Sequence, residues 1–245
     1  MEFARAMIRS NRILNFNMVE RDNWIQAQAK SIAPGSTVLD VGAGSCPYRS
    51  LFAHCDYKAQ DAACLEDHQL RSHRGYGTID YYCDATAIPI PDQSVDVVLC
   101  TEVMEHVPEP IRVVREIGRI LKPGGKLLLT APLGSGIHQA PFHFYGGYTP
   151  YWYNKFLAEA GFENIQIEPN GGFYKHFGQE CMRFSRMTFP LNLDVNLFIK
   201  LLWFPAWLLM MPWLAIMAPL VCHFMDRLDK DKGFTIGYHV TAEKH

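Results

Sequence analysis

The chain has 245 residues, of which 49% are hydrophobic and 13% aromatic, so it is long enough to bury one sizeable core. Its 23 basic and 25 acidic residues give a net charge of −2, which removes the electrostatic basis for holding nucleic acid. The seven cysteines include no CxxC pair, and the first residues contain no apolar run of signal-peptide length, so we expect free thiols in a reducing, cytoplasmic setting.

The first predicted elements are a helix over residues 22–32 and a strand that begins at Val38. We expect the helix to shield the mouth of a ligand site. The strand ends in a glycine turn, Asp40-Val41-Gly42-Ala43-Gly44, where bare backbone can turn with positive φ and approach a ligand. A dinucleotide loop would carry a third glycine where this chain has Pro47, so the pattern speaks against NAD or FAD.

Acidic residues end the next two predicted strands. Asp61 follows residues 57–60, and Asp84 follows residues 79–83. Because the carboxyl ends of parallel strands meet at one edge of a sheet, we expect both carboxylates to lie there with Asp40. Three carboxylates suit a cationic, ribose-bearing ligand such as S-adenosylmethionine better than a polyphosphate. Each also has a simpler explanation, since Asp40 could fix the loop, Asp61 a helix start and Asp84 a turn.

The remaining elements alternate between strand and helix. Residues 110–121 have apolar positions at a helical period and end at a Lys-Pro-Gly-Gly turn, which leads into a predicted strand over 126–131. Residues 165–169 and 234–242 suit the last two strands. This alternation predicts an α/β fold with a doubly wound, Rossmann-like sheet.

The blocks at residues 38–45, 61, 83–85, 95–100 and 121–127 together resemble the class I S-adenosylmethionine-dependent methyltransferases, in the small-molecule, type 11-like group. The resemblance implies a seven-stranded sheet with an antiparallel last strand, S-adenosylmethionine as the cofactor and methyl transfer as the activity. Cys46 departs from the pattern, because many members have another glycine there. The resemblance also implies the cofactor-binding residues, which are Asp40, Gly42, Ala43, Gly44, Asp61, Asp84, Ala85 and Glu102.

A hydrophobic helical insertion precedes the last predicted strand. Residues 201–222 carry no charge and are enough to cross a bilayer, yet the strand over 234–242 has to rejoin the sheet. We therefore predict a monotopic, membrane-associated insertion, broken by prolines into short pieces that lie in one leaflet. The expected prolines, interfacial tryptophans and headgroup-binding basic residues are Pro205, Pro212, Pro219, Trp203, Trp207, Trp213, Arg183, Arg186, Lys200, Arg227, Lys230 and Lys232.

These patterns predict an N-terminal helical cap over 1–33, a methyltransferase core over 34–175 and 230–245, and the insertion over 176–229. Residues 1–17 could form a second surface-lying helix or pack on the sheet, and the sequence leaves both open. The insertion could also be a buried cap, a lid or a homodimer interface. We expect the protein to be cytoplasmic and peripheral on the cytoplasmic membrane face.

The acceptor is predicted to lie beside the loop over residues 132–145, which follows the fifth strand. Methyl transfer mainly needs alignment and exclusion of water, and only some acceptors need a base. Histidines in such loops often only hold the loop in place, and no spacing of histidines and carboxylates predicts a metal site. Candidate bases are His138, His143 and His106, and candidate residues to orient an acceptor hydroxyl are Tyr145 and Tyr148.

The sequence thus predicts a methyltransferase that acts, by O-methylation, on a lipophilic or membrane-held acceptor such as a lipid, a quinone precursor or a lipid-linked sugar. One alternative is a soluble small-molecule acceptor, with the insertion as dimer interface or lid. Another is a catalytically inactive membrane scaffold.

Overall fold

The computed structural model describes residues 13, 15–71 and 75–245. The chain divides into two compact units. The first, here called the core unit, comprises residues 22–168 and 237–245; the second, the hairpin unit, comprises residues 1–21 and 169–236. The domain boundaries expected from the sequence lie at other residues and stay predictions.

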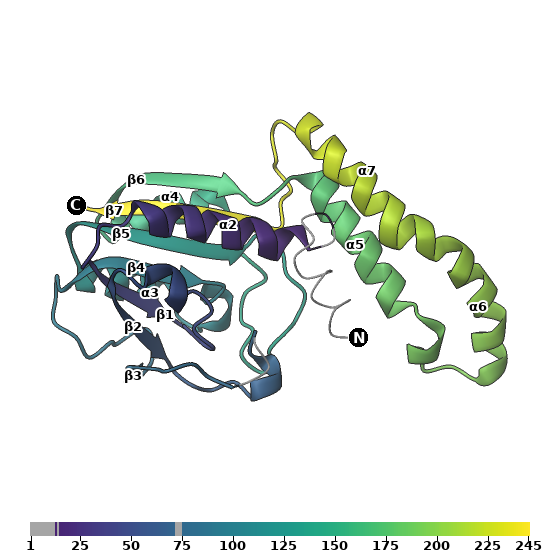
Figure 1. The fold of residues 1–245 in the computed structure, drawn as a ribbon, viewed down its shortest axis with the longest axis horizontal. Helices are drawn as coiled ribbons and strands as arrows, with labels where there is room; N and C mark the ends of the chain where they lie inside the picture. The colour runs from purple at the N-terminus through teal and green to yellow at the C-terminus, as the bar shows by residue number, and fades with distance from the viewer. Residues whose placement is uncertain (1–12, 14, 72–74) are drawn as a thin grey trace. The chain divides into compact units, whose positions relative to one another are not determined.

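The core unit contains a seven-stranded sheet of order β3-β2-β1-β4-β5-β7-β6 (Figure 1). Neighbouring strands from β3 to β5 are parallel, and β7 is antiparallel to β5. This confirms the predicted Rossmann-like sheet with an antiparallel last strand. The strands are β1 (Thr37–Val41), β2 (Asp56–Asp61), β3 (Tyr81–Tyr82), β4 (Val95–Thr101), β5 (Leu121–Pro132), β6 (Phe162–Pro169) and β7 (Gly237–Lys244).

The central strands are apolar because both faces of the sheet are covered. In β1, Leu39 and Val41 belong to one buried cluster and Val38 to another. The first cluster includes the apolar face of α3 (Pro110–Ile120), which confirms the helix expected there. The second includes Ile25 of α2 (Phe16–Ser31).

Two helices of the chain before the hairpin have start sites that can be compared with the sequence. Helix α4 (Pro150–Glu159) begins with Pro150 after Thr149, whose side chain accepts a hydrogen bond from the N–H of Trp152. Helix α2 begins six residues earlier than expected, at Phe16, rather than at residue 22. The surface helix considered within residues 1–17 falls largely outside the described residues.

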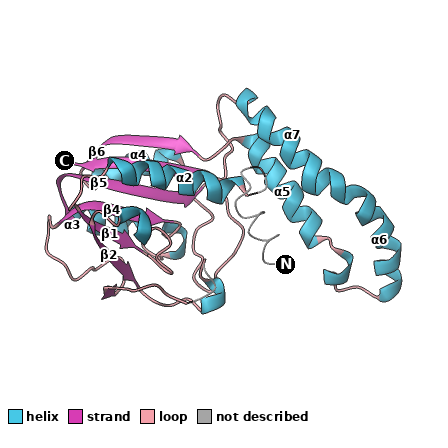
Figure 2. Ribbon diagram, viewed as in Figure 1, coloured by secondary structure: helices cyan, strands magenta, loops and turns pink. Residues whose placement is uncertain are grey.

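The hairpin unit contains α5 (Phe173–Met187), a short 3₁₀ turn (Pro190–Asn192) and a long helical stretch that runs back beside α5 (Figures 1 and 2). The returning stretch, Leu197–Leu228, spans 32 residues and is here called the apolar helix. Among the described residues, it alone has the length and hydropathy needed to cross a membrane. Its parts are α6 (Leu197–Pro212), a π-helical segment (Trp213–Met217), α7 (Ala218–Met225) and a 3₁₀ turn (Asp226–Leu228).

The expectation that prolines break this segment into short pieces is wrong. The helix continues through Pro205, which leaves the carbonyl of Leu201, an exposed residue, without its usual helical donor. After Pro212 the helix changes to π-helical hydrogen bonds, which join residues five apart, over Trp213–Met217. Pro219 lies in the first turn of α7. A helix can therefore accommodate all three prolines without ending.

Two of the three tryptophans hold the hairpin together rather than pointing outward. The indole N–H of Trp203 donates to the carbonyl of Thr188 at 2.8 Å, and that of Trp207 donates to the carbonyl of Ser185 at 2.9 Å. Trp213, by contrast, is 67% exposed. The carboxylates of Asp226 and Asp229 accept hydrogen bonds from backbone N–H groups at the start of α5, so both ends of the hairpin are fixed.

Candidate cofactor and acceptor site

The glycine turn after β1 has the backbone that its sequence predicts. Gly42 has a φ of +68°, a conformation that L side chains rarely adopt. A Cβ at this position would lie 2.4 Å from Cγ2 of Val103, which follows β4. The backbone of the turn therefore packs directly against the end of the neighbouring strand, and glycine is required there.

The backbone amides of the turn are bound by the end of β2. The N–H of Gly42 donates to Oε1 of Gln60 at 3.2 Å, and the N–H of Ala43 donates to the carbonyl of Gln60 at 3.0 Å. The N–H of Gly44 donates to Oδ2 of Asp61 at 2.8 Å. Because these donors are already used, the turn does not offer the set of free amides that cradles a pyrophosphate.

Asp61 lies at the last position of β2, at the carboxyl edge of the sheet. Its Oδ1 accepts a second backbone bond, from the N–H of Ala63 at 2.7 Å. A carboxylate has about four acceptor sites, so both oxygens can still accept ribose hydroxyls. The structure thus gives Asp61 a role in fixing the loop, and its contact with a cofactor stays a prediction.

Asp40 is buried at the end of β1, directly before the glycine turn. Burial raises the pKa of its carboxyl to about 7, against the hydrogen bond that the Tyr57 hydroxyl donates to Oδ2. Among the described residues, Oδ1 has no hydrogen-bond partner. A buried acceptor of this kind, beside carboxylates and without free amides, fits a cationic ligand such as S-adenosylmethionine and does not fit a polyphosphate.

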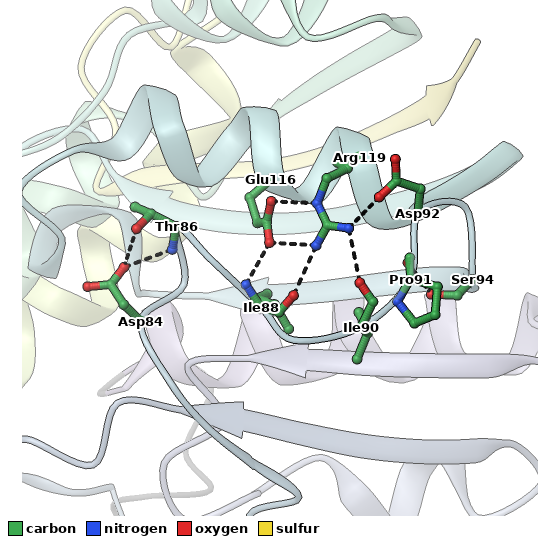
Figure 3. Close-up of polar contacts among 9 residues, drawn as sticks. All are labelled: Asp84, Thr86, Ile88, Ile90, Pro91, Asp92, Ser94, Glu116 and Arg119. Atoms are coloured by element: carbon green, nitrogen blue, oxygen red, sulfur yellow. Dashed lines mark hydrogen bonds and ion pairs between the residues drawn. The ribbon is translucent and has the colours of Figure 1, made fainter.

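Asp84 follows β3 and forms a local turn (Figure 3). Its Oδ1 accepts hydrogen bonds from the N–H of Thr86 at 2.8 Å and from the Thr86 hydroxyl at 2.7 Å. This is the simpler role considered for Asp84, and the carboxylate is exposed. Ala85 beside it is buried. Their contact with the adenine stays a prediction.

The loop that continues from this turn is tied to α3 by side chains that the sequence did not indicate. Glu116 accepts a hydrogen bond from the N–H of Ile88 at 2.6 Å (Figure 3). Arg119 pairs with Glu116 at 2.8 Å and with Asp92 at 2.6 Å. The Arg119 guanidinium and the Ile88 N–H lower the pKa of Glu116 despite its burial, so it stays a carboxylate. The loop beside Asp84 is therefore rigidly held.

Glu102 follows β4 with a φ of +53°, which is a strained backbone for a residue other than glycine. Its Oε1 accepts a hydrogen bond from the Thr130 hydroxyl at 2.9 Å, and its N–H donates to the Thr130 carbonyl at 2.9 Å. Neighbouring β5 thus fixes both the backbone and the side chain at the carboxyl edge, where the cofactor pocket is expected.

The three candidate histidines come together. The ring centres of His106 and His138 are 4.7 Å apart, those of His138 and His143 are 4.8 Å apart, and those of His106 and His143 are 5.8 Å apart. His106 belongs to the short turn after β4, and the other two belong to the loop after β5. Adjacent strands therefore bring into one cluster residues that lie more than thirty positions apart in the chain.

The surroundings of two of these histidines, His106 and His143, favour the neutral imidazole. Burial lowers the pKa of His106, and the nearby rings of His138 and His143 lower it further, although its bond to the Phe142 carbonyl acts in the opposite direction. Burial and the neighbouring His138 also lower the pKa of His143. At neutral pH both rings can therefore accept a proton, as a general base must.

The two candidate tyrosines both have backbone partners. The Tyr145 hydroxyl donates to the carbonyl of Pro108 at 3.0 Å, and the Tyr148 hydroxyl donates to the carbonyl of Met104 at 2.6 Å. Tyr148 is also buried. These bonds hold the acceptor-side loop against the segment after β4, and contact of either hydroxyl with an acceptor stays a prediction.

Sequence reasoning missed Gln60 and Glu105, each 1% exposed. Gln60 links two loops, because its Oε1 accepts from Gly42 while its Nε2 donates to the carbonyl of Cys83 at 2.5 Å. Its position inside a buried strand, directly before Asp61, was the available signal. Glu105 precedes His106, and its carbonyl accepts the N–H of Phe144 at 2.9 Å.

Comparison with known proteins agrees with this geometry. Residues 39–129 match the model of a methyltransferase domain. A protein of Mycobacteroides abscessus named an uncharacterized methyltransferase is 35% identical over 137 residues, which are 51% of this chain and 52% of that protein. A ubiquinone biosynthesis O-methyltransferase of Pseudomonas paraeruginosa is 35% identical over 117 residues, covering 45% of this chain and 49% of that protein.

The chain thus spans about half the length of the curated relatives it matches. Among solved structures, phosphoethanolamine N-methyltransferase 2 of Haemonchus contortus in complex with S-adenosyl-L-methionine shares the fold with a TM-score of 0.52 and 18% identity. The match covers 95% of this chain and 55% of that chain. The family match, the sheet order and the glycine turn lead to one conclusion: the chain carries a class I S-adenosylmethionine-dependent methyltransferase domain.

Proposed function

We propose that this protein transfers the methyl group of S-adenosylmethionine to an oxygen atom of a lipophilic acceptor held in a membrane. The cofactor, when bound, supplies a methyl group on a positively charged sulfur. In this proposal Asp40 and Asp61 hold and orient the cofactor at the ends of β1 and β2. The histidine cluster, with His106 and His143 neutral, accepts the proton that an acceptor hydroxyl loses.

The observation that carries the membrane part of the proposal is the exposure of the apolar helix. Only 11% of the most apolar 18-residue stretch of this helix is buried within the structure. Moving one leucine or phenylalanine side chain from water into an apolar environment is favourable by about 1.5–3 kcal/mol. A helix that exposes many such side chains to water therefore gains free energy when it binds an apolar phase. The most exposed of them are Leu209 (76%), Leu197 (71%), Phe198 (69%) and Trp213 (67%).

The chain path favours a helix that lies in the membrane surface. The turn before the apolar helix contains Asp194 and Asn196, and Lys200 lies in its first turn, so inserting this end would bury polar groups. At the other end the chain returns to β7 in the same sheet that it left at β6. Both ends therefore stay on one side, as in a monotopic protein.

Basic side chains near the hairpin could bind anionic lipid headgroups, but two of those expected from the sequence already pair with carboxylates. Arg183 pairs with Glu180 at 3.2 Å, and Lys232 pairs with Asp226 at 3.4 Å. These ion pairs reduce the attraction of Arg183 and Lys232 to anionic headgroups. The proposal therefore relies on Arg186 and Arg227, each worth about 1 kcal/mol near an anionic surface.

The acceptor side of the site supports the proposed acceptor class. Neutral imidazoles suit removal of a proton from a hydroxyl, which an O-methyltransferase needs. The similarity to a ubiquinone biosynthesis O-methyltransferase supports an oxygen on a lipophilic molecule, and that name belongs to the relative. We propose a peripheral position on the cytoplasmic membrane face, where such an acceptor would be available.

Flotation with vesicles of phosphatidylcholine and phosphatidylglycerol tests the membrane part. The wild-type protein is expected to float, and the double variant Leu202→Glu/Leu209→Glu is expected to stay at the bottom. The control is Tyr151→Glu, which places one added glutamate at an 85% exposed position of α4 in the core unit. Equal flotation of all three proteins would contradict membrane binding through the apolar helix.

Incubation with radiolabelled S-adenosylmethionine and a total membrane extract tests the acceptor class. Label in the organic phase after extraction supports a lipophilic acceptor and provides material to identify. Label in the aqueous phase alone would favour a soluble acceptor, with the apolar helix as a lid or a homodimer interface. Cofactor binding without any transfer would favour an inactive membrane scaffold.

A further inference from the structure

The histidine cluster contains a set of donor atoms that no sequence spacing indicated. One donor atom from each of Glu105, His106 and His138 lies within 4.8 Å of the others. Glu105 is 1% exposed and the His106 side chain is 12% exposed, whereas His138 lies on an exposed loop. Two imidazoles and one buried carboxylate thus meet at one point of the carboxyl edge.

Hydrogen bonds fix the tautomers of both imidazoles. Nδ1 of His106 lies 2.5 Å from the Phe142 carbonyl, and Nδ1 of His138 lies 2.9 Å from the Gly136 carbonyl. Because a carbonyl oxygen only accepts, each Nδ1 must carry the hydrogen. In the neutral ring the lone pair is then on Nε2, which is the arrangement that protein backbones commonly impose on metal-binding histidines.

We propose that this cluster binds one divalent transition-metal ion, Zn²⁺ or a metal of similar preference, through Nε2 of His106, Nε2 of His138 and the carboxylate of Glu105. Two nitrogen donors and one oxygen donor suit zinc and its neighbours, whereas magnesium and calcium prefer sites made of oxygen. The ring of His143 lies 4.8 Å from that of His138, so it stands next to the ion.

The required movement is small and falls on a loop. Ligand bonds of about 2.0–2.2 Å put the donor atoms of a tetrahedral site about 3.3–3.6 Å apart. Nε2 of His106 is already 3.7 Å from Oε1 of Glu105. The remaining approach belongs to His138, whose loop position leaves it exposed. Glu105 and His106 therefore form the fixed part of the site, and His138 closes it.

Three protein ligands leave at least one coordination position open, as in catalytic rather than structural zinc sites. An oxygen of the acceptor could occupy that position, and the ion would make its hydroxyl more acidic. With His106 and His138 bound to the ion, the proton would pass to the neighbouring His143 alone. This chemical role rests on the proposed function, whereas binding of the ion does not.

The test is titration of the untagged, full-length protein with Co²⁺, followed by displacement with Zn²⁺. Visible absorption of Co²⁺ is strong in tetrahedral sites, and cysteine ligands add an intense thiolate band in the near ultraviolet. We expect one equivalent of Co²⁺, strong visible bands, no thiolate band and displacement by one equivalent of Zn²⁺. No cofactor, acceptor or membrane is present, so failure here is distinct from failure of the proposed function.

The decisive variant is His138→Ala, because an exposed loop residue can be replaced without loss of the fold. We expect its affinity for Co²⁺ to fall on the order of 100-fold with an unchanged unfolding midpoint. The matched control is His68→Ala, which removes an exposed histidine of a different loop, 3.2 Å from Glu66. Glu105→Gln, which keeps the size of the side chain but removes its charge, is also expected to lower the affinity for Co²⁺.

Three results would overturn the proposal. They are absence of Co²⁺ and Zn²⁺ binding to the wild-type protein, a thiolate band that assigns the ion to cysteines, and equal affinity of the wild-type and His138→Ala proteins.

Discussion

The core unit and the hairpin unit are both rich in apolar residues, but they use them in opposite ways. In the core unit, Leu128 is fully buried between the sheet and its covering helices. In the hairpin unit, Leu209 is 76% exposed. The same residue type therefore stabilises the fold in one unit and is available to a partner in the other. Composition alone does not distinguish the two uses.

The polar groups of the two units also differ in what they hold. In the core unit, Asp61 and Gln60 bind the backbone of the glycine turn, so the loops of the site are fixed before any ligand arrives. In the hairpin unit, Asp226 and Asp229 bind the first N–H groups of α5 and fix a helix end. The first pair of residues fixes the loops of the candidate site, and the second pair fixes the helix against which the apolar helix packs.

The largest expected effect concerns pH and the core unit. Because folding raises the pKa of Asp40 from 3.8 to about 7, the folded state holds this proton more tightly. The protonated Asp40 carboxyl therefore stabilises the fold fully below pH 4, and this stabilisation is lost as the pH rises through 7. The free energy of unfolding is expected to fall by about 4 kcal/mol over the whole interval. Urea unfolding of the wild-type and Asp40→Asn proteins between pH 4 and 8 measures it. A stability difference between them that does not change with pH would contradict the assignment.

Leucine truncation in the two units gives the next largest effect. Leu128→Ala is expected to lower the free energy of unfolding by about 3 kcal/mol, because it leaves a cavity. Leu209→Ala should change it by less than about 0.5 kcal/mol, because the side chain is exposed. Urea denaturation measures both. Similar losses would show that the apolar helix is buried in solution, as a dimer interface would be.

Glycine substitution separates steric from conformational cost within the core unit. Gly42→Ala is expected to cost at least about 2 kcal/mol, because its Cβ would meet Val103 and its φ is positive. The control, Gly35→Ala, also has a positive φ of +80° but has no atom within 4 Å of the added Cβ, so it should cost about 1 kcal/mol. Unfolding of both variants is compared with their affinity for S-adenosylmethionine. Equal costs would mean that Val103 moves aside.

The smallest expected effect tests the proposed ribose contact. Asp61→Asn keeps the size of the side chain but weakens its acceptors, and it should reduce the affinity for S-adenosylmethionine about tenfold, or about 1.4 kcal/mol. Calorimetric titration measures this change. Asp67→Asn, an exposed carboxylate in the same loop, is the control and should bind as the wild-type protein does. Unchanged affinity of Asp61→Asn would leave that residue a loop-fixing role alone.

The sequence by itself determined the elements whose signals are local. The apolar run of β1 ending in glycines indicated a cofactor turn, and the amphipathic period of residues 110–121 indicated α3. Such patterns are readable because burial on both faces of a strand, or on one face of a helix, depends on neighbouring residues in the chain. The family and its cofactor followed from the order of these blocks.

Tertiary structure alone decided what lies where separate loops meet. His106 and His138 became neighbours because β4 and β5 are adjacent in the sheet, and no linear spacing reports that. The apolar helix continues through Pro205 although a proline there removes one helical hydrogen bond, and the inward position of Trp207 depended on α5. Convergence of side chains is a property of topology, whereas sequence patterns report the local backbone and its burial.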